Sequence, residues 1–343
     1  MRGFLLLVIT CAALAATAQD VPQLAGAQKE VALHPSSQDA WWALGTLYYD
    51  QDKFAEARDA LKHLVSLNAE AGPGFSLLGL CEYRTMEYDA ALAHLGRGYT
   101  LGVRGKGSLA QISEFHLVAL LTRVGQFEAA LEKLTELIAS GADEDAPTIA
   151  VAGLAALRQP LLPFGVPEKD RALVTTAGKA VLDTLARRPD KAEADFKILV
   201  ATYPDVPNVH YTYGSYLLVA DPDRALAELK QELVISPHHL PALVAIAVEY
   251  LRRTDAAVAL PFAREAVENY PQSFEAHNIL GRALVETGRL EVGMKELQQS
   301  ARLAPESPQT HFALAAAYAK AGRKTEAAKE RAEFLRLKNE IAQ

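Results

Sequence analysis

The chain has too few cysteines for a disulfide framework, because only 2 of its 343 residues are cysteine. One of them, Cys11, lies in a segment that we expect to be removed from the mature protein. Cys81 would then have no partner within the chain for a disulfide. A reactive thiol needs exposure and cationic neighbours, whereas Cys81 sits in an apolar stretch with helical periodicity. We interpret it as a buried, inert side chain, so the fold must be held by packing.

The chain also has no excess of positive charge. It contains 35 Lys and Arg against 42 Asp and Glu, for a net charge of −7. A protein that binds nucleic acid through the phosphate backbone needs a basic surface that releases the condensed counterions. This composition therefore predicts no nucleic-acid partner.

No apolar run is long enough to cross a bilayer after the N-terminus. The first residues, Met1 to Gly3, carry one positive charge, and an apolar run from Phe4 to Ala16 follows. This run is shorter than the ~20 residues of a transmembrane helix, and its pattern is typical of a secretory signal peptide. We therefore expect a signal peptide over residues 1–18 and a periplasmic or secreted protein.

The cleavage site has the small-x-small form at Ala16-Thr17-Ala18, which would leave Gln19 as the mature N-terminus. A lipoprotein attached through Cys11 is a minor alternative. Thr10 is bulkier than the small residue that precedes the cysteine in a site resembling the bacterial lipobox. No stable membrane span is expected once the signal is removed.

Catalytic signatures are missing as well. The chain contains no G-x-x-x-x-G-K-[ST] loop, H-E-x-x-H pair, G-x-S-x-G elbow or paired-cysteine zinc pattern. His210, His277 and His311 recur along the chain, but stacked helices lie about 10 Å apart and zinc ligands must lie within about 2.1 Å of one ion. We therefore predict no metal, no cofactor and no enzymatic activity.

What the sequence does contain is a repeat. Leu44-Gly45 recurs 34 residues later as Leu78-Gly79, and Leu280-Gly281 recurs as Leu314-Ala315 at the same spacing. Prolines end successive units near the C-terminus with spacings of 33, 34 and 34 residues: Pro204, Pro237, Pro271 and Pro305. A fixed period of this length indicates a stack of helix pairs that bury one another's apolar faces.

The segment Trp41 to Tyr48 matches W-x2-L-G-x2-Y in full, and Ala57 lies where the pattern has its small residue. In these residues the chain resembles the tetratricopeptide-repeat (TPR) family, as in an exported bacterial protein. The resemblance implies an all-α fold, a right-handed superhelical solenoid of antiparallel helix pairs with about eight repeats and one irregular joint.

We expect the following organisation along the chain. A lead-in and capping segment over residues 19–37 precedes an N-terminal array of three repeats over 38–144. An irregular, unpaired helix and a proline-rich joint occupy 145–172, where three prolines follow Arg158. A C-terminal array of five repeats with a terminal capping helix covers 173–343.

In this family the concave face is lined chiefly by the first helix of each unit, so its side chains follow from the repeat phase. Aromatic side chains and arginines, which dominate binding hot spots, are frequent there. The groove residues predicted in this way are Trp42, Tyr49, Tyr83, Arg84, Arg123, Asn208, Tyr211, Ser215, Arg252, Asn278, Arg282 and Glu286. Several of these side chains have an equally good interpretation as packing between helices.

The leading hypothesis is a non-catalytic scaffold that binds a protein or peptide in this groove, in the periplasm or cell envelope. The alternative is an accessory module that binds glycans or cell-wall polymers beside an enzyme, with Trp42, Tyr49 and Tyr83 stacking on sugar rings. Self-association is left open by the sequence. The lysine, asparagine and arginine set with which chaperone-binding members of the family hold a terminal carboxylate is not complete here.

Overall fold

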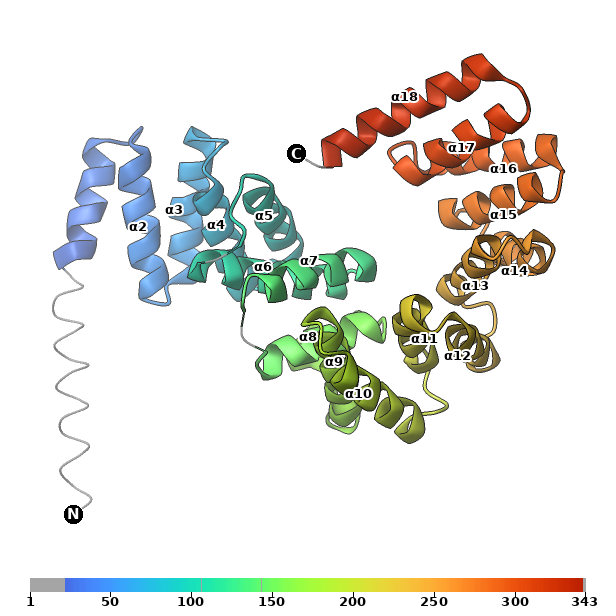
Figure 1. Cartoon of the computed structure of the whole chain (residues 1–343). Coiled ribbons are helices and arrows are strands. Elements are labelled where there is room, and N and C mark those ends of the chain that lie inside the picture. The colour runs from blue at the N-terminus through green and yellow to red at the C-terminus, as the bar shows by residue number, and fades with distance from the viewer. Residues whose placement is uncertain (1–21, 106, 143, 342–343) are drawn as a thin grey trace. The chain divides into compact units, whose positions relative to one another are not determined.

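The computed structural model describes residues 22–341 except 106 and 143, and within them it is built of helices without a strand (Figure 1). The expected signal peptide and Cys11 lie outside the described residues. None of the described helices has the length and apolarity required to cross a membrane. The all-α fold predicted from the repeat is confirmed.

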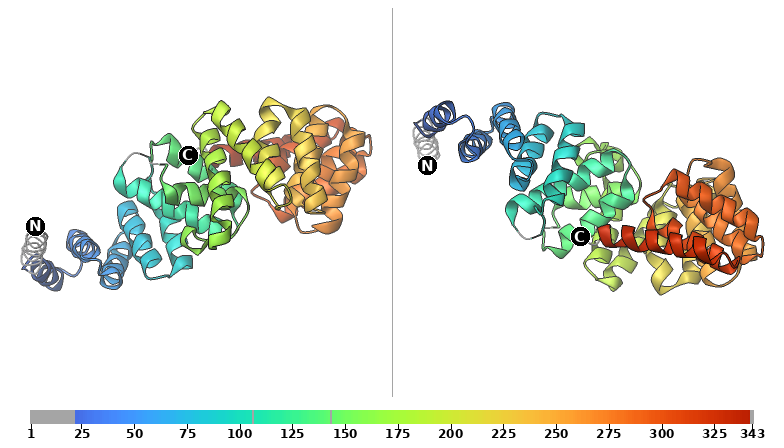
Figure 2. Two further views of the ribbon diagram at one scale, coloured as in Figure 1. Left: turned by 90° about the horizontal axis from the view of Figure 1, so that it is seen from below. Right: turned by 90° about the horizontal axis from the view of Figure 1, so that it is seen from above.

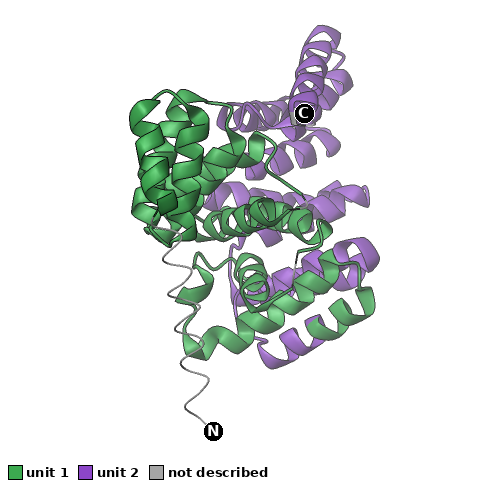
Figure 3. Ribbon diagram, turned by 90° about the vertical axis from the view of Figure 1, so that its left-hand side faces the viewer, with its two compact units in different colours: residues 1–195 green, residues 196–343 purple. Residues whose placement is uncertain are grey.

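The chain divides into two compact units, residues 1–195 and 196–343 (Figure 3). The division falls inside helix α10, whereas we expected a joint at residues 145–172. In the first unit a helical segment over residues 22–33 is followed by α2 (Gln38–Asp50), α3 (Phe54–Leu67), α4 (Gly72–Arg84), α5 (Tyr88–Thr100), α6 (Ser108–Arg123), α7 (Phe127–Ala139), α8 (Ala146–Ala156), α9 (Arg171–Leu185) and the start of α10 (Pro189–Thr202).

The second unit contains the rest of α10 and four further helix pairs. These are α11 (Val209–Ala220) with α12 (Pro222–Ile235), α13 (Leu240–Arg252) with α14 (Ala256–Asn269), α15 (Phe274–Glu286) with α16 (Leu290–Leu303), and α17 (Pro308–Lys320) with α18 (Lys324–Ile341). Successive pairs of this unit form a layered stack in the views of Figures 1 and 2.

The small residues of the repeat allow the two helices of a pair to approach closely. A Cβ atom added at Gly45 would lie 2.8 Å from the side chain of Leu61, and one added at Gly281 would lie 2.6 Å from that of Leu297. Both leucines are fully buried. Because a side chain at either glycine would overlap the leucine, the recurrent Leu-Gly sequence is explained by packing within each pair.

The helix over 147–158 that we expected to be unpaired packs closely against α9. Its N-terminus is capped by Asp145, whose carboxylate accepts a hydrogen bond from the Thr148 backbone N–H at 3.0 Å. A Cβ atom at Gly153 would lie 2.0 Å from the carbonyl oxygen of Val174, so the two backbones nearly touch. The proline-rich stretch is thus the connection within a helix pair, and it contains only two short 3-10 turns, Pro163–Gly165 and Glu168–Asp170.

Both ends of the array bury the apolar faces of their terminal helices. Leu24, Ala27 and Val31 of the lead-in helix pack against Ala40 and Leu44 of α2. At the C-terminus α18 spans Lys324–Ile341 and buries Leu337 and Ala327. Terminal helices of this kind cover the apolar face of the last repeat, which would otherwise be exposed to water.

Three histidines occupy the position of the signature tryptophan and join each helix pair to the preceding loop. In each, Nε2 lies 2.9 to 3.0 Å from the carbonyl oxygen of the proline six residues earlier, and Nδ1 lies 2.5 to 2.7 Å from a glutamate of the next helix. The triplets are His210 with Pro204 and Glu228, His277 with Pro271 and Glu296, and His311 with Pro305 and Glu330.

In the first repeat Trp41 makes the same contact, because its indole N–H donates to the carbonyl oxygen of Pro35 at 2.8 Å. Histidine and tryptophan thus make an equivalent contact at this position, in which a ring N–H donates to the proline carbonyl oxygen. The two nitrogens of His210, His277 and His311 are engaged within the fold, and the described residues contain no cluster of metal-ligating side chains.

We expect the His210 contact to make folding stability depend on pH. The hydrogen bond to Glu228 raises the pKa of His210 above its ordinary value of 6.5, against an opposing effect of burial. A histidine whose pKa is raised in the folded state contributes its full stabilisation of the fold at pH values below the unfolded pKa. This stabilisation is lost as the pH rises through the folded pKa. His210→Ala should therefore cost about 1.5–3 kcal/mol near pH 5.5 and less near pH 9, measured by urea unfolding. An equal loss at both pH values would contradict this assignment.

Candidate interaction groove

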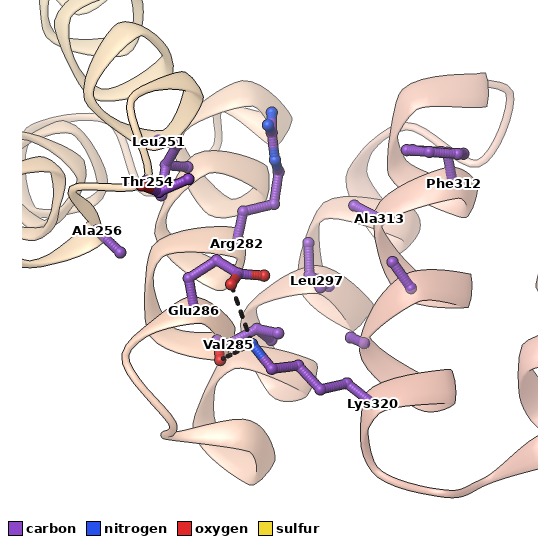
Figure 4. Close-up of a pocket in the computed structure, with 12 residues that line it drawn as sticks. Leu251, Thr254, Ala256, Arg282, Val285, Glu286, Leu297, Phe312, Ala313 and Lys320 are labelled. Atoms are coloured by element: carbon purple, nitrogen blue, oxygen red, sulfur yellow. Dashed lines mark hydrogen bonds and ion pairs between the residues drawn. The ribbon is translucent and has the colours of Figure 1, made fainter.

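In the C-terminal unit, a pocket of about 360 Å³ lies between the first helices of three successive pairs, α13, α15 and α17. Figure 4 shows its polar side chains, Arg282 and Glu286 from α15 and Lys320 from α17. The apolar lining residues are Leu251, Ala256, Val285, Leu297, Phe312, Ala313, Ala316 and Ala317.

Lys320 and Glu286 neutralise each other at one side of this pocket. Nζ of Lys320 lies 3.0 Å from Oε2 of Glu286 and donates to the carbonyl oxygen of Val285 at 3.2 Å. The pair is half-exposed, so its contribution to stability is small, but it fixes the direction of both side chains. The carboxylate of Glu286 also acts electrostatically on Arg282, but the two side chains form no ion pair.

Arg282 is not compensated in this way. The described residues offer it no hydrogen bond or ion pair, and Figure 4 shows its side chain extending away from the Lys320–Glu286 pair. Partial desolvation lowers the pKa of Arg282 and the carboxylate of Glu286 opposes this effect, and a guanidinium remains protonated at neutral pH. The residue is exposed, so Arg282 presents a positive charge without an ion pair at the open side of the groove.

A second pocket, of about 290 Å³, lies between α17 and α18 and shares Phe312 and Ala316 with the first. Phe312 is 60 % exposed and Leu335 is 50 % exposed, although both are large and apolar. The ring of Phe334 lies 5.4 Å from that of Phe312. The remaining lining residues are Ala315 and Arg331. Phe334 and Leu335 lie on α18, the second helix of its pair, and the prediction of groove residues from first helices did not include them.

Of the groove residues predicted for the C-terminal unit, several are committed to packing between repeats. Asn278 is 9 % exposed, and its Nδ2 lies 3.5 Å from Oγ1 of Thr310 on the next pair. Asn208 accepts a hydrogen bond from His239 at 2.9 Å, and Tyr211 packs edge-on against the same ring at 5.0 Å. These side chains hold neighbouring repeats together at the inner face.

The other predicted residues of this unit have simpler surroundings. Arg252 is exposed and pairs with Glu249 of its own helix at 2.7 Å. Ser215 is half-buried on α11. Of the twelve predicted residues, Arg282 and Glu286 line the same pocket between the described helices α13, α15 and α17.

In the N-terminal unit the predicted arginines form a ladder with aromatic rings. Arg84, at the end of α4, lies 4.2 Å from the centre of the Phe54 ring at the start of α3. Arg123, at the end of α6, lies 4.8 Å from that of Tyr88 at the start of α5. Each arginine thus stacks on the preceding repeat, where a cation–π contact contributes about 0.5–1 kcal/mol.

Arg158 continues this ladder at 4.9 Å from the Phe127 ring, and sequence reasoning missed it because we assigned residue 158 to the joint. Arg123 and Arg158 also pair with the acidic residue that follows each ring, Asp89 and Glu128. The signal was present in the sequence, since an aromatic residue followed by an acid begins both α5 and α7. The ladder stabilises contacts between repeats.

The aromatic residues on which the glycan alternative depends are engaged in similar contacts. Tyr49 packs edge-on against Phe54 at 5.6 Å, and Tyr83 packs against Tyr88 at 5.5 Å and His116 at 4.4 Å. Burial raises the pKa of both tyrosine hydroxyls. Trp42 is half-buried on α2. No open aromatic platform of the kind that stacks on sugars is formed by these three residues.

The N-terminal unit also has a pocket, of about 280 Å³, between α6 and α8. It is lined by Ile112, Phe115 and His116 on one side and by Pro147 and Thr148 on the other. Desolvation lowers the pKa of His116, whose Nδ1 contacts the Ile112 carbonyl oxygen at 2.7 Å. His116 is then neutral, and the one charged lining residue is Asp145, whose carboxylate caps α8, so this pocket carries no positive charge comparable to Arg282.

Cys81 is fully buried, and burial raises the pKa of its thiol to about 12. A thiol with this pKa is not a nucleophile at neutral pH. Cys81 is one of the buried residues of α4, as the apolar pattern of the sequence indicated.

Taken together, consecutive helix pairs with a 34-residue period define a helical-repeat protein. A model of the tetratricopeptide repeat matches residues 22–74, 43–101 and 244–308. These parts of the chain are tetratricopeptide repeats. Solenoids of this family typically present their surfaces to proteins or peptides and carry no catalytic centre of their own.

Comparison with the curated proteins gives no match. Among solved structures, the chain is similar to MamA 41-end from Desulfovibrio magneticus RS-1, with 21% identity, 51% of this chain and 97% of that chain covered, and a TM-score of 0.44. A structure described as MamA RS-1 ArsTM double mutant gives the same values. Another, described as crystal structure of MamA protein, has 15% identity, covers 50% and 93%, and has a TM-score of 0.42. We draw no functional conclusion from these likenesses.

Proposed function

We propose that the mature chain is a non-catalytic scaffold that binds a segment of another protein in the groove formed by α13, α15 and α17. The observation that carries the proposal is the exposed guanidinium of Arg282, which has no ion pair among the described residues and lines the same pocket as the exposed ring of Phe312. A guanidinium forms charge-assisted hydrogen bonds to an anionic partner, and an exposed large aromatic ring gains by being covered. A partner that covers the groove can make both contacts.

We also propose that this binding takes place in the periplasm or outside the cell. The support is the sequence of the first residues, in which one positive charge precedes a short apolar run and a small-x-small cleavage site. Mass spectrometry of the protein recovered from an envelope fraction tests this proposal. A mature N-terminus at Gln19 is the expected result, and a chain retaining Met1 in the cytoplasm would contradict it.

Crosslinking pull-down from an envelope extract tests the scaffold function. The groove variant is Arg282→Ala/Phe312→Ala, which removes two exposed side chains and leaves Asn278 and its interrepeat contact in place. The matched control is Arg302→Ala/Val292→Ala on α16, where Arg302 bonds only to Gln299 of its own helix and Val292 is 50 % exposed. Neither control residue lines a pocket described above.

We expect a partner that the wild type and the α16 control both capture and that the groove variant loses. Equal capture by all three proteins would place the binding surface elsewhere and overturn the proposal for this groove. Melting temperatures of the three purified proteins should agree within a few degrees, because surface substitutions cost at most about 0.5 kcal/mol.

A further inference from the structure

The two pockets on either side of Phe312 define the chemistry of the partner more closely. We infer that they receive an internal, extended segment of a protein in which an acidic side chain reaches Arg282 and a neighbouring large apolar side chain fills the pocket between α17 and α18. This inference rests on the proposed function and specifies the ligand class for the same groove.

Charge argues for the acidic side chain. The walls of the two pockets carry three cations and one anion, although the whole chain has a net charge of −7. Glu286 is already paired with Lys320. Arg282 and Arg331 are left without an ion pair among the described residues. A carboxylate bound to a guanidinium makes charge-assisted, bidentate hydrogen bonds, and Arg282 has no such partner among the described residues.

Shape argues for the apolar side chain. The second pocket is lined by Phe312, Phe334, Leu335, Ala315 and Ala316, with Arg331 at its edge. Small alanine side chains beside two aromatic rings leave a depression with few polar atoms. Its volume of about 290 Å³ is enough for one phenylalanine or leucine side chain. Filling it would cover the exposed faces of Phe312 and Leu335 and remove apolar surface from water.

Continuity argues for an internal segment and not a chain end. Phe312 and Ala316 form a wall of both pockets, so a segment with its carboxylate at Arg282 continues over Phe312 into the apolar pocket. A terminal carboxylate would place two negatively charged oxygens and the end of the chain at the same point, and it is best held by several donors. Here Lys320 is committed to Glu286 and Val285, which leaves Arg282 as the one cation without an ion pair among the residues lining that pocket.

Fluorescence anisotropy with the whole mature protein tests the inference. The ligands are fluorescein-labelled, C-terminally amidated peptides in which one aspartate and one phenylalanine are separated by increasing numbers of serines in a glycine-serine background. We expect saturable binding for at least one spacing. Replacing aspartate by asparagine, or phenylalanine by alanine, should weaken binding about tenfold or more, since a charge-assisted bond and a buried ring each contribute more than about 1.4 kcal/mol.

A charge-reversal variant tests the role of Arg282 in the same binding experiment. Arg282→Glu should abolish binding of the aspartate peptide and create binding of the same peptide with lysine in its place, whereas Arg302→Glu should leave the aspartate peptide bound as in the wild type. A free C-terminal acid should bind no better than the amidated peptide. Tighter binding of a peptide that ends in the free carboxylate at the aspartate position would overturn the choice of an internal segment.

The outcomes separate this inference from the function on which it rests. If Phe312→Ala abolishes capture of the crosslinked partner and Arg282→Glu does not, the acidic side chain is wrong and the scaffold function stands. If no peptide binds and no partner is lost from any groove variant, both are overturned. Binding of the aspartate peptide that survives Arg282→Glu would also reject the role given to Arg282.

Discussion

Replacing Gly178 by alanine is expected to lower the free energy of unfolding of the N-terminal unit by about 3 kcal/mol or more. A Cβ atom at this position would lie 1.9 Å from the carbonyl oxygen of Ile149, far inside the van der Waals contact distance. The obstacle is backbone of α8, so no side chain can rotate away to make room. The two helices must separate, and the fully buried Val151, Leu154 and Ala177 then lose part of their packing.

Urea unfolding followed by circular dichroism measures this loss. Gly96→Ala is the matched control, because Gly96 lies in α5 and an added Cβ would meet nothing within 4 Å. In an open helical position alanine is favoured over glycine, so this control should gain about 0.5–1 kcal/mol. If Gly178→Ala behaved like Gly96→Ala, the close contact between α8 and α9 would be incorrect.

The same contact shows why the sequence predicted most of the fold but not this pair. Periodicity located the helices that begin at Gln38, Gly72, Leu240, Phe274 and Pro308 because each unit repeats a Leu-Gly or similar pair at 34 residues. Between α8 and α9 the connection is longer and proline-rich, so the period is lost while the packing persists. Gly153 and Gly178 allow α8 and α9 to approach closely, but the number of residues between them differs from the 34-residue period.

The candidate groove was predictable only in part for a related reason. Repeat phase places a side chain on the inner face, and Arg282, Glu286 and Phe312 do lie there. Phase does not state which neighbour a side chain meets. Asn278 contacts Thr310 of the next pair, and Arg84 lies over the Phe54 ring of the preceding one. Whether an inner-face residue is available to a partner depends on these contacts between repeats, which the sequence alone does not encode in a local pattern.

The histidine at the signature position makes the same hydrogen bond as the tryptophan that it replaces. Tryptophan and imidazole differ in size and charge, yet Trp41 and His277 each donate a ring N–H to the proline carbonyl six residues earlier. Histidine adds a second nitrogen, which contacts a glutamate on the partner helix. The apparent metal-ligand series of the sequence is thus a repeated structural contact.

Phe196→Ala should have the largest effect in the C-terminal unit, a loss of about 3–5 kcal/mol. Phe196 is 1 % exposed on α10, and its ring stacks on Tyr213 at 5.3 Å and on Tyr216 at 4.9 Å, both from α11. Removing the ring leaves a cavity that these two large side chains cannot close without leaving their rotamers. Ile198→Ala on the same helix is the control, because Ile198 is 54 % exposed and should change stability little.

The part of the unit that loses stability in Phe196→Ala follows from the way in which repeats contact only their neighbours. Each repeat contacts only its neighbours, so damage between α10 and α11 should weaken those helices first and leave α15 to α18 folded at low denaturant. Hydrogen exchange measured by mass spectrometry should therefore show faster exchange in α10 to α12 of Phe196→Ala, with wild-type protection in α15 to α18. The Arg282 pocket would remain intact, and the aspartate peptide should bind the variant as it binds the wild type. Uniformly faster exchange across the unit would instead show that these four pairs unfold as a single cooperative block.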